Sequence, residues 1–416
     1  MISATQKAHI RPVHPFPARM APSIVWDALP KGGDSLNILD PMSGSGTTLV
    51  CARSRGHRAI GCDTDPLALL IARAWCDDAE PESLKVRAGI VLERAMTLSK
   101  RLTSKKSYPK NTDDETRRFI DFWFDPGNRR ELCALSTCIS RVGSQAERTL
   151  LWCAFSRMII TKTSGASLAM DVSHSRPHKV YDLAPVKPFD TFLKSVSTVA
   201  CNCPFIGHAN SAPPADIRYG DARALPIESA SVDMVITSPP YLNAIDYLRG
   251  HKLSLVWMGH SISEIRAIRA GNIGAEVSEE STSNTAIQEA MRAMVDFESL
   301  DNRRLGMVRR YVWDMSKVME ECARVLKRAG RAVFVVGESA ISGVFIKNSE
   351  ALIRLADSNG LSLVSRNTRP IERRRRYLPP PESERAGDNM QGRMREEVIL
   401  EFRSDKKNRG FRIDRG

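Results

Sequence analysis

A strand, a glycine-rich turn, a helix and a second strand follow one another near the start of this 416-residue chain, and this order restricts the fold more than any other feature. Apolar residues at 36–40 predict a buried strand that enters the turn Pro41-Met42-Ser43-Gly44-Ser45-Gly46-Thr47-Thr48. A helix is expected to follow and to end near Gly56, before a second strand at 58–63. Alternation of this kind predicts a doubly wound α/β fold with a mostly parallel sheet.

The turn and the end of the second strand have the chemistry of a ligand site. Backbone N–H groups in a glycine turn can approach a ligand closely, and the N-terminus of the next helix attracts negative charge. No Gly-Lys-Ser/Thr sequence follows, which disfavours a nucleoside triphosphate. Asp63 ends the second strand, where a carboxylate can hold ribose hydroxyls, with a turn or cap carboxylate as the alternative. Asp65 and Pro66 predict the start of a helix through Trp75.

A second motif, Ser238-Pro239-Pro240-Tyr241, ends an apolar run at 232–236 that predicts a short buried strand. Two consecutive prolines end strand pairing, because neither has an N–H to donate. The Ser238 hydroxyl and the Pro239 carbonyl are acceptors, and Tyr241 has an aromatic face for stacking. These groups suit an exocyclic amino group on a flat ring, and the alternative is a plain turn.

Composition favours an intracellular protein with a polyanionic partner. The formal charge of +13 suggests nucleic acid, although a merely basic soluble protein is the alternative. Nine scattered cysteines indicate a reducing cytoplasm, and the pair Cys201 and Cys203 lacks a second pair at zinc spacing, so no metal site is expected. No apolar run reaches membrane-span length and no signal peptide is evident, so no membrane contact is expected.

With the segment His14-Pro15-Phe16-Pro17-Ala18-Arg19-Met20-Ala21-Pro22, these motifs resemble the S-adenosylmethionine-dependent DNA amino-methyltransferases, which modify cytosine N4 or adenine N6. The His-Pro segment resembles the family motif that flanks the methionine end of the cofactor. The turn matches the family's Phe-x-Gly-x-Gly loop, with Met42 in place of Phe, and Ser238 begins its catalytic tetrapeptide. The resemblance covers roughly residues 9–76 and 216–258, and more loosely 311–403.

The resemblance implies S-adenosyl-L-methionine as cofactor, no metal, and a seven-stranded Rossmann-like methyltransferase sheet. It also implies a target base flipped out of duplex DNA. Asp221, after a predicted third strand at 217–221, is expected to accept from the adenine amino group of the cofactor, and Gly46→Asp to abolish cofactor binding in a folded protein. The implied catalytic residues are Ser238, Pro239, Pro240 and Tyr241. The implied cofactor-binding residues are His14, Phe16, Arg19, Asp40, Met42, Ser43, Gly44, Ser45, Gly46, Thr47, Thr48, Asp63 and Asp221.

Four domains or segments are expected from the positions of the motifs. Residues 1–76 and 216–403 would form the methyltransferase core, residues 77–215 a largely helical insertion and candidate target-recognition module, and residues 404–416 a basic tail. Apolar spacing predicts helices at 84–102, 116–124, 130–142, 148–160, 311–327 and 349–358, and strands at 331–336, 361–366 and 396–402. The polar residues 259–302 are expected to be either a disordered spacer or a segment that orders on DNA.

Two stretches are candidates for contact with DNA. One is irregular and carries His174, Arg176, His178 and Lys179; a plain surface loop is the alternative. The other is the run Arg373, Arg374, Arg375 and Arg376, where the alternative is a solvated loop.

The function expected from these features is site-specific methylation of double-stranded DNA by a cytoplasmic, nucleoid-associated enzyme. Ser at the first tetrapeptide position is commoner among the cytosine N4 enzymes of the family, so N4-methylcytosine is favoured over N6-methyladenine. An RNA guanine-N2 methyltransferase and a catalytically inactive DNA-binding partner subunit are rival hypotheses. A companion restriction endonuclease and the oligomeric state stay open.

Overall fold

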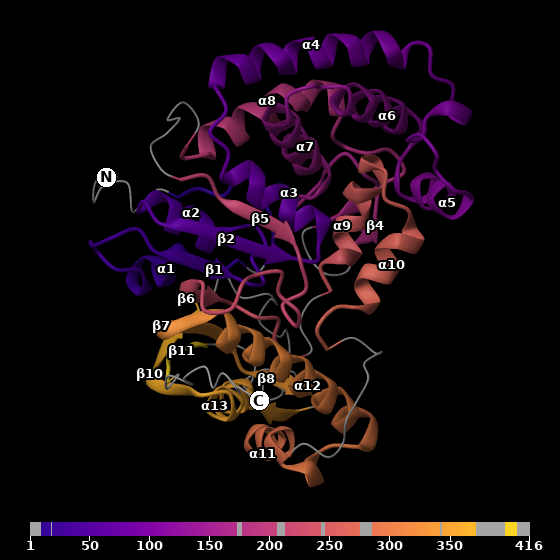
Figure 1. The fold of residues 1–416 in the computed structure, drawn as a ribbon. Helices are drawn as coiled ribbons and strands as arrows, with labels where there is room; N and C mark the ends of the chain where they lie inside the picture. The colour runs from indigo at the N-terminus through magenta and orange to yellow at the C-terminus, as the bar shows by residue number, and fades with distance from the viewer. Residues whose placement is uncertain are drawn as a thin grey trace, which may run out of the picture. The chain divides into compact units, whose positions relative to one another are not determined.

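The computed structural model describes residues 10–17, 19–172, 177–205, 213–242, 246–274, 285–341, 343–371 and 396–405. The strands of its main sheet are β1 (Asn37–Asp40), β2 (Arg58–Asp63), β5 (Asp216–Tyr219), β6 (Val232–Thr237), β7 (Leu326–Gly337), β10 (Leu361–Pro370) and β11 (Glu396–Ser404). They lie in the order β10-β11-β7-β6-β1-β2-β5 (Figure 1). β1, β6 and β7 pair in parallel, as do β2 and β5, whereas β11 is antiparallel to both β7 and β10. The predicted α/β class with a mostly parallel, seven-stranded sheet is confirmed.

Tertiary contacts divide the chain into two compact units. Unit 1 comprises Met1–Leu29, Ser43–Tyr219 and Ile245–Ala270. Unit 2 comprises Pro30–Met42, Gly220–Ala244 and Gly271–Gly416. The helices of the predicted insertion therefore share unit 1 with the glycine turn.

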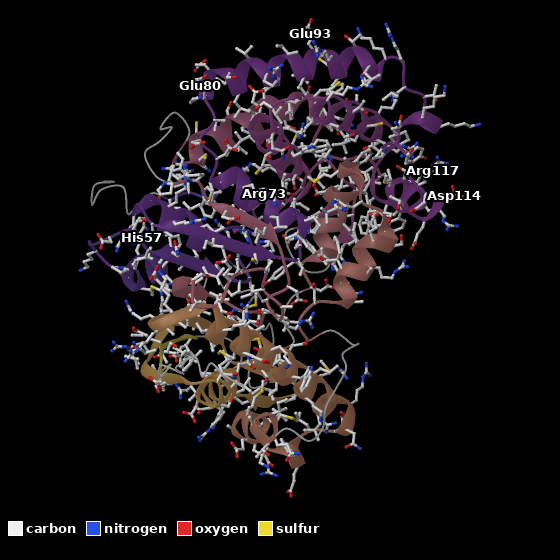
Figure 2. All side chains as sticks on the ribbon, in the orientation of Figure 1. His57, Arg73, Glu80, Glu93, Asp114 and Arg117 are labelled. Carbon is white, nitrogen blue, oxygen red and sulfur yellow. The ribbon has the colours of Figure 1, made fainter. Side chains whose placement is uncertain are left out.

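Unit 1 is mostly helical around β2 and β5, and several of its helices begin at a residue whose side chain caps the helix. Asp65, Asp113, Asp125 and Ser144 each accept a hydrogen bond from the first turn of a helix. Glu80, the N-cap of α4, and Glu93, within α4, are both exposed (Figure 2). The elements are α1 (Pro22–Ala28), α2 (Thr47–Ser54), α3 (Pro66–Trp75), α4 (Pro81–Ser99), α5 (Asp114–Trp123), α6 (Pro126–Ser140), α7 (Gln145–Ile159), α8 (Pro188–Asn202), α9 (Leu248–Leu255), α10 (Ile262–Ala270), the short 3-10 helices η2 (Ser104–Lys106) and η3 (Val256–Met258), and the hairpin strands β3 (Ala169–Met170) and β4 (His178–Lys179).

Unit 2 contains the remaining five strands of the main sheet. Its helices are α11 (Thr285–Met294), α12 (Asn302–Val325) and α13 (Asn348–Ser358), with the 3-10 helix η4 (Phe297–Ser299) and the small hairpin β8 (Ser339–Ile341) and β9 (Val344–Ile346). The predicted apolar side of α12 is buried, namely Val312, Met315, Val318, Met319, Cys322 and Val325.

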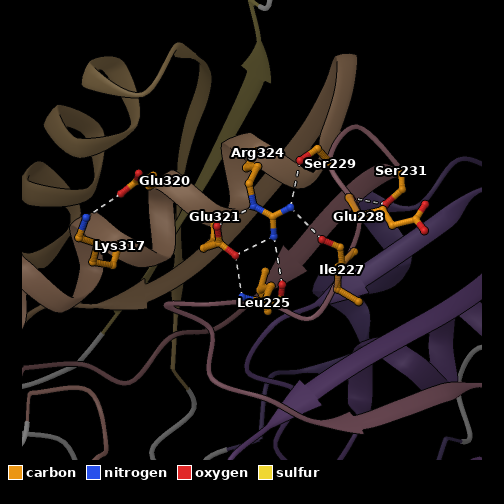
Figure 3. Close-up of polar contacts among 9 residues, drawn as sticks. All are labelled: Leu225, Ile227, Glu228, Ser229, Ser231, Lys317, Glu320, Glu321 and Arg324. Carbon is orange, nitrogen blue, oxygen red and sulfur yellow. Dashed lines mark hydrogen bonds and ion pairs between the residues drawn. The ribbon is translucent and has the colours of Figure 1, made fainter.

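Arg324, at the end of α12, fixes the segment that leads into β6 (Figure 3). Its guanidinium donates to the carbonyls of Leu225 (3.1 Å) and Ile227 (2.8 Å) and to Glu321 (2.7 Å). Glu321 in turn accepts from the Leu225 N–H at 2.6 Å. These contacts set where β6 begins, and β6 carries the tetrapeptide at its other end.

Two expectations about secondary structure need correction, and one helix was not predicted. Residues 262–270 and 285–294 are helices, so the described parts of 259–302 are not an irregular spacer. In α11 the apolar residues Ile287, Met291 and Met294 are buried, which explains why this polar stretch folds. Helix α8 was not predicted, and β5 ends at Tyr219, two residues before Asp221. None of the described helices is long and apolar enough to cross a membrane.

Candidate active site

The glycine turn after β1 is shaped by backbone hydrogen bonds within unit 1. Ser43 N–H donates to Cys62 O at 2.9 Å, and Gly46 N–H donates to Ser43 O at 2.8 Å. Gly44 N–H donates to the Asp63 carboxylate at 2.8 Å. Gly44 (φ +48°) and Gly46 (φ +91°) both have left-handed backbone conformations, which explains why glycine stands at these two positions.

Gly46 serves the packing of two helices. A Cβ atom at this position would lie 2.9 Å from the Cβ of Ala72 on α3. The expected result for Gly46→Asp, loss of cofactor in an intact fold, therefore needs correction, because any side chain here would push α2 away from α3.

The other predicted turn residues lie in or beside the same turn. Ser45, Thr47 and Thr48 are buried, and the two threonines form the first turn of α2. Met42 is half-buried, and its N–H donates to the Asp40 carboxylate at 3.2 Å.

Asp63 is fixed at the end of β2 through both of its carboxylate oxygens. Oδ2 accepts from Gly44 N–H, and Oδ1 accepts from Asp65 N–H at 2.9 Å. Asp65 accepts from Leu67 N–H at 2.9 Å, so the predicted N-cap of α3 is confirmed. The carboxylate predicted to hold ribose is therefore tied directly to the glycine turn.

His14 is buried in unit 1, with Nε2 at 3.0 Å from the Ser156 hydroxyl of α7. Burial, with the charge of Arg157 second, holds the pKa of His14 well below its usual range. The ring is therefore neutral at physiological pH, and its role is that of a hydrogen-bonding group rather than a cation.

Phe16 lies against the glycine turn. A Cβ atom on Gly44 would be 3.6 Å from Cε1 of the Phe16 ring, which is ordinary van der Waals contact. Arg19, three residues on, has its guanidinium carbon 6.0 Å from the centroid of the Trp75 ring. The N-terminal segment thus supplies an aromatic wall beside Gly44.

The tetrapeptide at the end of β6 belongs to unit 2, as does Asp40. Asp40 is buried and accepts from the Thr237 hydroxyl at 2.7 Å, which joins the end of β1 to the end of β6. Ser238 donates its hydroxyl proton to the Val335 carbonyl of β7 at 2.9 Å. Within the described residues the Pro239 carbonyl accepts no hydrogen bond. Two acceptors are thus available for a substrate at this strand end.

Tyr241 has its hydroxyl 3.4 Å from Ser238 Oγ. Burial raises the pKa of Tyr241 to about 12, against the lowering effect of Ser238 and with a smaller contribution from the charge of Glu397. The phenol therefore stays uncharged well above neutral pH.

Asp221 is held in an ion-pair network of unit 2. Arg223 Nη2 lies 2.7 Å from Asp221, and Arg223 Nη1 lies 2.7 Å from Asp314 on α12. The pKa of Asp221 is lowered because the bonds from Arg223 outweigh burial, the largest single effect, which raises it. An adenine amino group that approached Asp221 would find its carboxylate already paired with Arg223. The role of Asp221 in binding the cofactor therefore stays a prediction.

The DNA-binding candidates are placed only in part. His178 and Lys179 form β4 and are exposed, and Lys179 Nζ lies 5.0 Å from the centroid of the Phe122 ring. His174, Arg176, Arg373, Arg374, Arg375 and Arg376 lie outside the described residues.

Sequence reasoning missed two groups near these motifs. In unit 1, His251 of α9 contacts Asp65 through Nδ1 at 2.5 Å. In unit 2, Tyr311 of α12 is buried within electrostatic reach of Tyr241, and its hydroxyl has no partner among the described residues. Asp65 and His251 are 186 positions apart, so no local pattern indicates the pair.

The residues around the glycine turn fit a ligand with an amino-acid end. Ser43 Oγ, His14 Nδ1 and His251 Nε2 are buried polar atoms without a partner in the part of the chain that the structure describes. Buried polar atoms of this kind are normally hydrogen-bonded, and the ammonium and carboxylate groups of S-adenosylmethionine offer both donors and acceptors.

No family model matches the chain. Over 365 residues it is 25% identical to the type II methyltransferase M.MvaI of Kocuria varians, across 80% of this chain and 78% of that protein. It is 24% identical to the type II methyltransferase M.AvaI of a Nostoc species, across 78% of this chain and 73% of that protein. Among solved structures, an S-adenosylmethionine-dependent methyltransferase from Methanosarcina mazei has 9% identity and a TM-score of 0.32, over 92% of this chain and 98% of that chain. That structural likeness is too weak to add to the sequence matches.

The chain has a mostly parallel, seven-stranded α/β sheet, and its sequence is similar to type II methyltransferases over 78–80% of its length. These matches confirm the resemblance, predicted from the motifs, to the class of S-adenosylmethionine-dependent DNA methyltransferases. S-adenosyl-L-methionine, the predicted cofactor, is the methyl donor of the class.

Proposed function

We propose that this protein is a site-specific DNA methyltransferase that modifies the exocyclic amino group of a flipped base, with cytosine N4 as its target. The relatives with type II methyltransferase activity support the DNA substrate. The observation that carries the proposal is the hydrogen bond from Ser238 to the Val335 carbonyl, because it determines what the hydroxyl can offer to a base.

Ser238 has a single hydroxyl proton, and that proton is directed at Val335. A target amino group therefore meets oxygen lone pairs and can donate one N–H to Ser238 and the other to the Pro239 carbonyl. Two such bonds hold the amino group so that its lone pair leaves ring conjugation. The nitrogen becomes a better nucleophile through positioning, without a strong base.

The neutral Tyr241 ring supplies the stacking face for the flipped base. S-adenosylmethionine, when bound, supplies a methyl group made electrophilic by its sulfonium. His14, Phe16, Arg19, Asp40, the turn from Met42 to Thr48, Asp63 and Asp221 are the residues proposed to hold it. The proton on the base nitrogen leaves after methyl transfer, so the proposed reaction requires no metal.

The choice of cytosine depends on Ser238. A carboxylate would accept more strongly from the amino group than a hydroxyl does, and the family resemblance associates serine at this position with cytosine N4. N6-methyladenine is the alternative product of the same mechanism. A guanine-N2 RNA methyltransferase normally has Asp at this position, and an inactive partner subunit would be expected to lack the glycines or the tetrapeptide, all of which are intact.

The direct test uses purified protein, S-adenosylmethionine with a labelled methyl group, and unmethylated duplex DNA that carries many different sites. After digestion to nucleosides, mass spectrometry should find the label in N4-methylcytosine. Label in N6-methyladenine would show that the target base is adenine rather than cytosine, and the proposed mechanism would still hold. Label in guanine of transfer RNA, with none in DNA, would refute the proposal.

A further inference from the structure

Five residues of unit 1, Gly44, Asp63, Asp65, His251 and Phe16, form a closed ring of contacts that includes the glycine turn. Gly44 N–H donates to Asp63, and the other oxygen of Asp63 accepts from Asp65 N–H. Asp65 contacts His251, whose ring centroid lies 5.0 Å from that of Phe16. Phe16 in turn covers Gly44. This ring of contacts contains the carboxylates of Asp63 and Asp65, and each of them attracts a positively charged ligand.

The contact with Asp65 fixes the tautomer of His251. Nδ1 lies 2.5 Å from Asp65 Oδ2, and an ionised carboxylate can only accept, so Nδ1 carries the hydrogen. With the ring's single hydrogen on Nδ1, Nε2 is a hydrogen-bond acceptor, and the neighbouring Asp65 carboxylate makes it a better partner for a cation.

This acceptor is buried and unused. The His251 side chain is 2% exposed, and Nε2 has no hydrogen-bond partner among the described residues. The imidazole of His251 is held between two aromatic rings. Tyr247 stacks on it with a centroid distance of 6.3 Å and an interplanar angle of 20°, and the Phe16 ring also contacts it. A buried acceptor held in one orientation is normally matched by a donor.

We propose that Nε2 of His251 accepts a hydrogen bond from the ammonium group at the amino-acid end of S-adenosylmethionine, with Asp65 as the residue that positions His251. The inference rests on the proposed function, because it assigns a new contact to the cofactor of that function. An ammonium donor supplies the missing hydrogen-bond partner of Nε2 and is attracted by the carboxylates of Asp63 and Asp65.

Two variants test the hydrogen bond of His251 Nε2 separately from the packing of the residues in this ring of contacts. His251→Phe keeps an aromatic ring against Phe16 and removes both nitrogens. Asp65→Asn keeps the N-cap of α3, since Asn caps as well as Asp, but its amide N–H can donate to Nδ1. The ring hydrogen then moves to Nε2, which would point a donor at the ammonium. His57→Phe is the matched control, because His57 is a buried histidine before β2 that is not part of the ring (Figure 2).

Isothermal titration calorimetry would compare S-adenosylmethionine with an analogue whose ammonium is replaced by hydrogen. His251→Phe and Asp65→Asn should each weaken S-adenosylmethionine binding by about 10- to 100-fold and leave the affinity for the analogue unchanged. The control His57→Phe should bind both ligands as the wild type does. Circular dichroism would verify folding, and Asp65→Asn gives the answer if His251→Phe does not fold.

Two results would overturn the proposal. Unchanged affinity of both variants for S-adenosylmethionine would show that the nitrogen is not used. An equal loss of affinity for S-adenosylmethionine and for the analogue would show that these residues only support the structure. A wild-type protein that binds neither ligand would instead count against the proposed function itself, so the two failures are distinguishable.

Discussion

At the scale of single residues, the proposed catalytic role of Ser238 depends on the direction in which its hydroxyl points. Ser238 donates to Val335, which is 97 positions away in the sequence, so the motif alone specifies a hydroxyl and not its orientation. The partner comes from the neighbouring strand β7, which pairs in parallel with β6.

Ser238→Ala should lower kcat about 100- to 1000-fold, the usual effect of removing one group that stabilises a transition state. Cofactor affinity should stay near the wild-type value, because this hydroxyl is proposed to contact the base. Ser229→Ala is the matched control, since Ser229 contacts Arg324 at 3.1 Å and lies outside the tetrapeptide. Turnover by Ser238→Ala at the wild-type rate would show that the tetrapeptide is only a turn and has no catalytic role.

His14 makes stability depend on pH. Its folded-state pKa lies well below the usual value near 6.5, so the unfolded chain takes up a proton that the folded chain refuses. Stability is therefore full above about pH 6.5 and is lost as pH falls, by at most about 1.4 kcal/mol per pH unit. His14→Gln should flatten the fall in free energy of unfolding between about pH 6.5 and 5, measured by urea denaturation. Parallel curves for the two proteins would contradict this assignment.

At the scale of secondary-structure elements, the two turn glycines differ in what they permit. Gly46→Ala should destabilise the protein by about 2–5 kcal/mol, because its Cβ would lie 2.9 Å from Ala72 on α3 at a left-handed φ. Gly44→Asn should cost only about 1 kcal/mol, because Asn tolerates that conformation and Phe16 is 3.6 Å away. Thermal unfolding would rank the two variants, and the reverse ranking would contradict the packing account. Gly44→Asn is also the better probe of cofactor binding.

Hairpin strand β4 carries His178 and Lys179, the DNA-binding candidates that the structure describes. Exposed His178 and Lys179 lie there near Phe122, whose side chain is 54% exposed. Replacing both by alanine should weaken DNA binding and reduce the slope of log K against log salt by about 1 for each phosphate that is no longer bound. Cofactor affinity should not change, and Lys100→Ala serves as the control. Equal DNA affinity and an equal salt slope would place DNA binding away from β4.

Helices could be predicted where a cap and an apolar period coincide. Asp65 with Pro66, and the period that follows, gave both bounds of α3 correctly. The helices of the insertion begin before the first apolar residues from which they were predicted. Their N-caps, Asp113, Asp125 and Ser144, lie before the apolar residues that define the helical period. Helix α11 was missed because its few apolar residues are surrounded by polar ones. Its helical state depends on burial against α13, which sequence does not reveal.

At the scale of the whole molecule, the predicted class follows from the alternation of strands and helices, whereas the strand order does not. Strand β11 lies between β7 and β10, and both pairings are antiparallel. Only the family resemblance implied such a sheet. The candidate residues at strand ends could be predicted because chemistry and position coincide in short motifs. The pairs Asp65 with His251 and Arg223 with Asp314 could not, because they join segments 186 and 91 positions apart.

The central claim is that the whole protein methylates cytosine N4 in duplex DNA, and one measurement in cells tests it most directly. The wild type and Ser238→Ala would each be expressed in a host without DNA methylases of its own, and the DNA digested to nucleosides for mass spectrometry. We expect N4-methylcytosine with the wild type and little or none with Ser238→Ala, and modification-sensitive sequencing should place it at one short sequence. If cells that contain the folded wild-type protein have N6-methyladenine instead, or no methylated base in their DNA, the claim is contradicted.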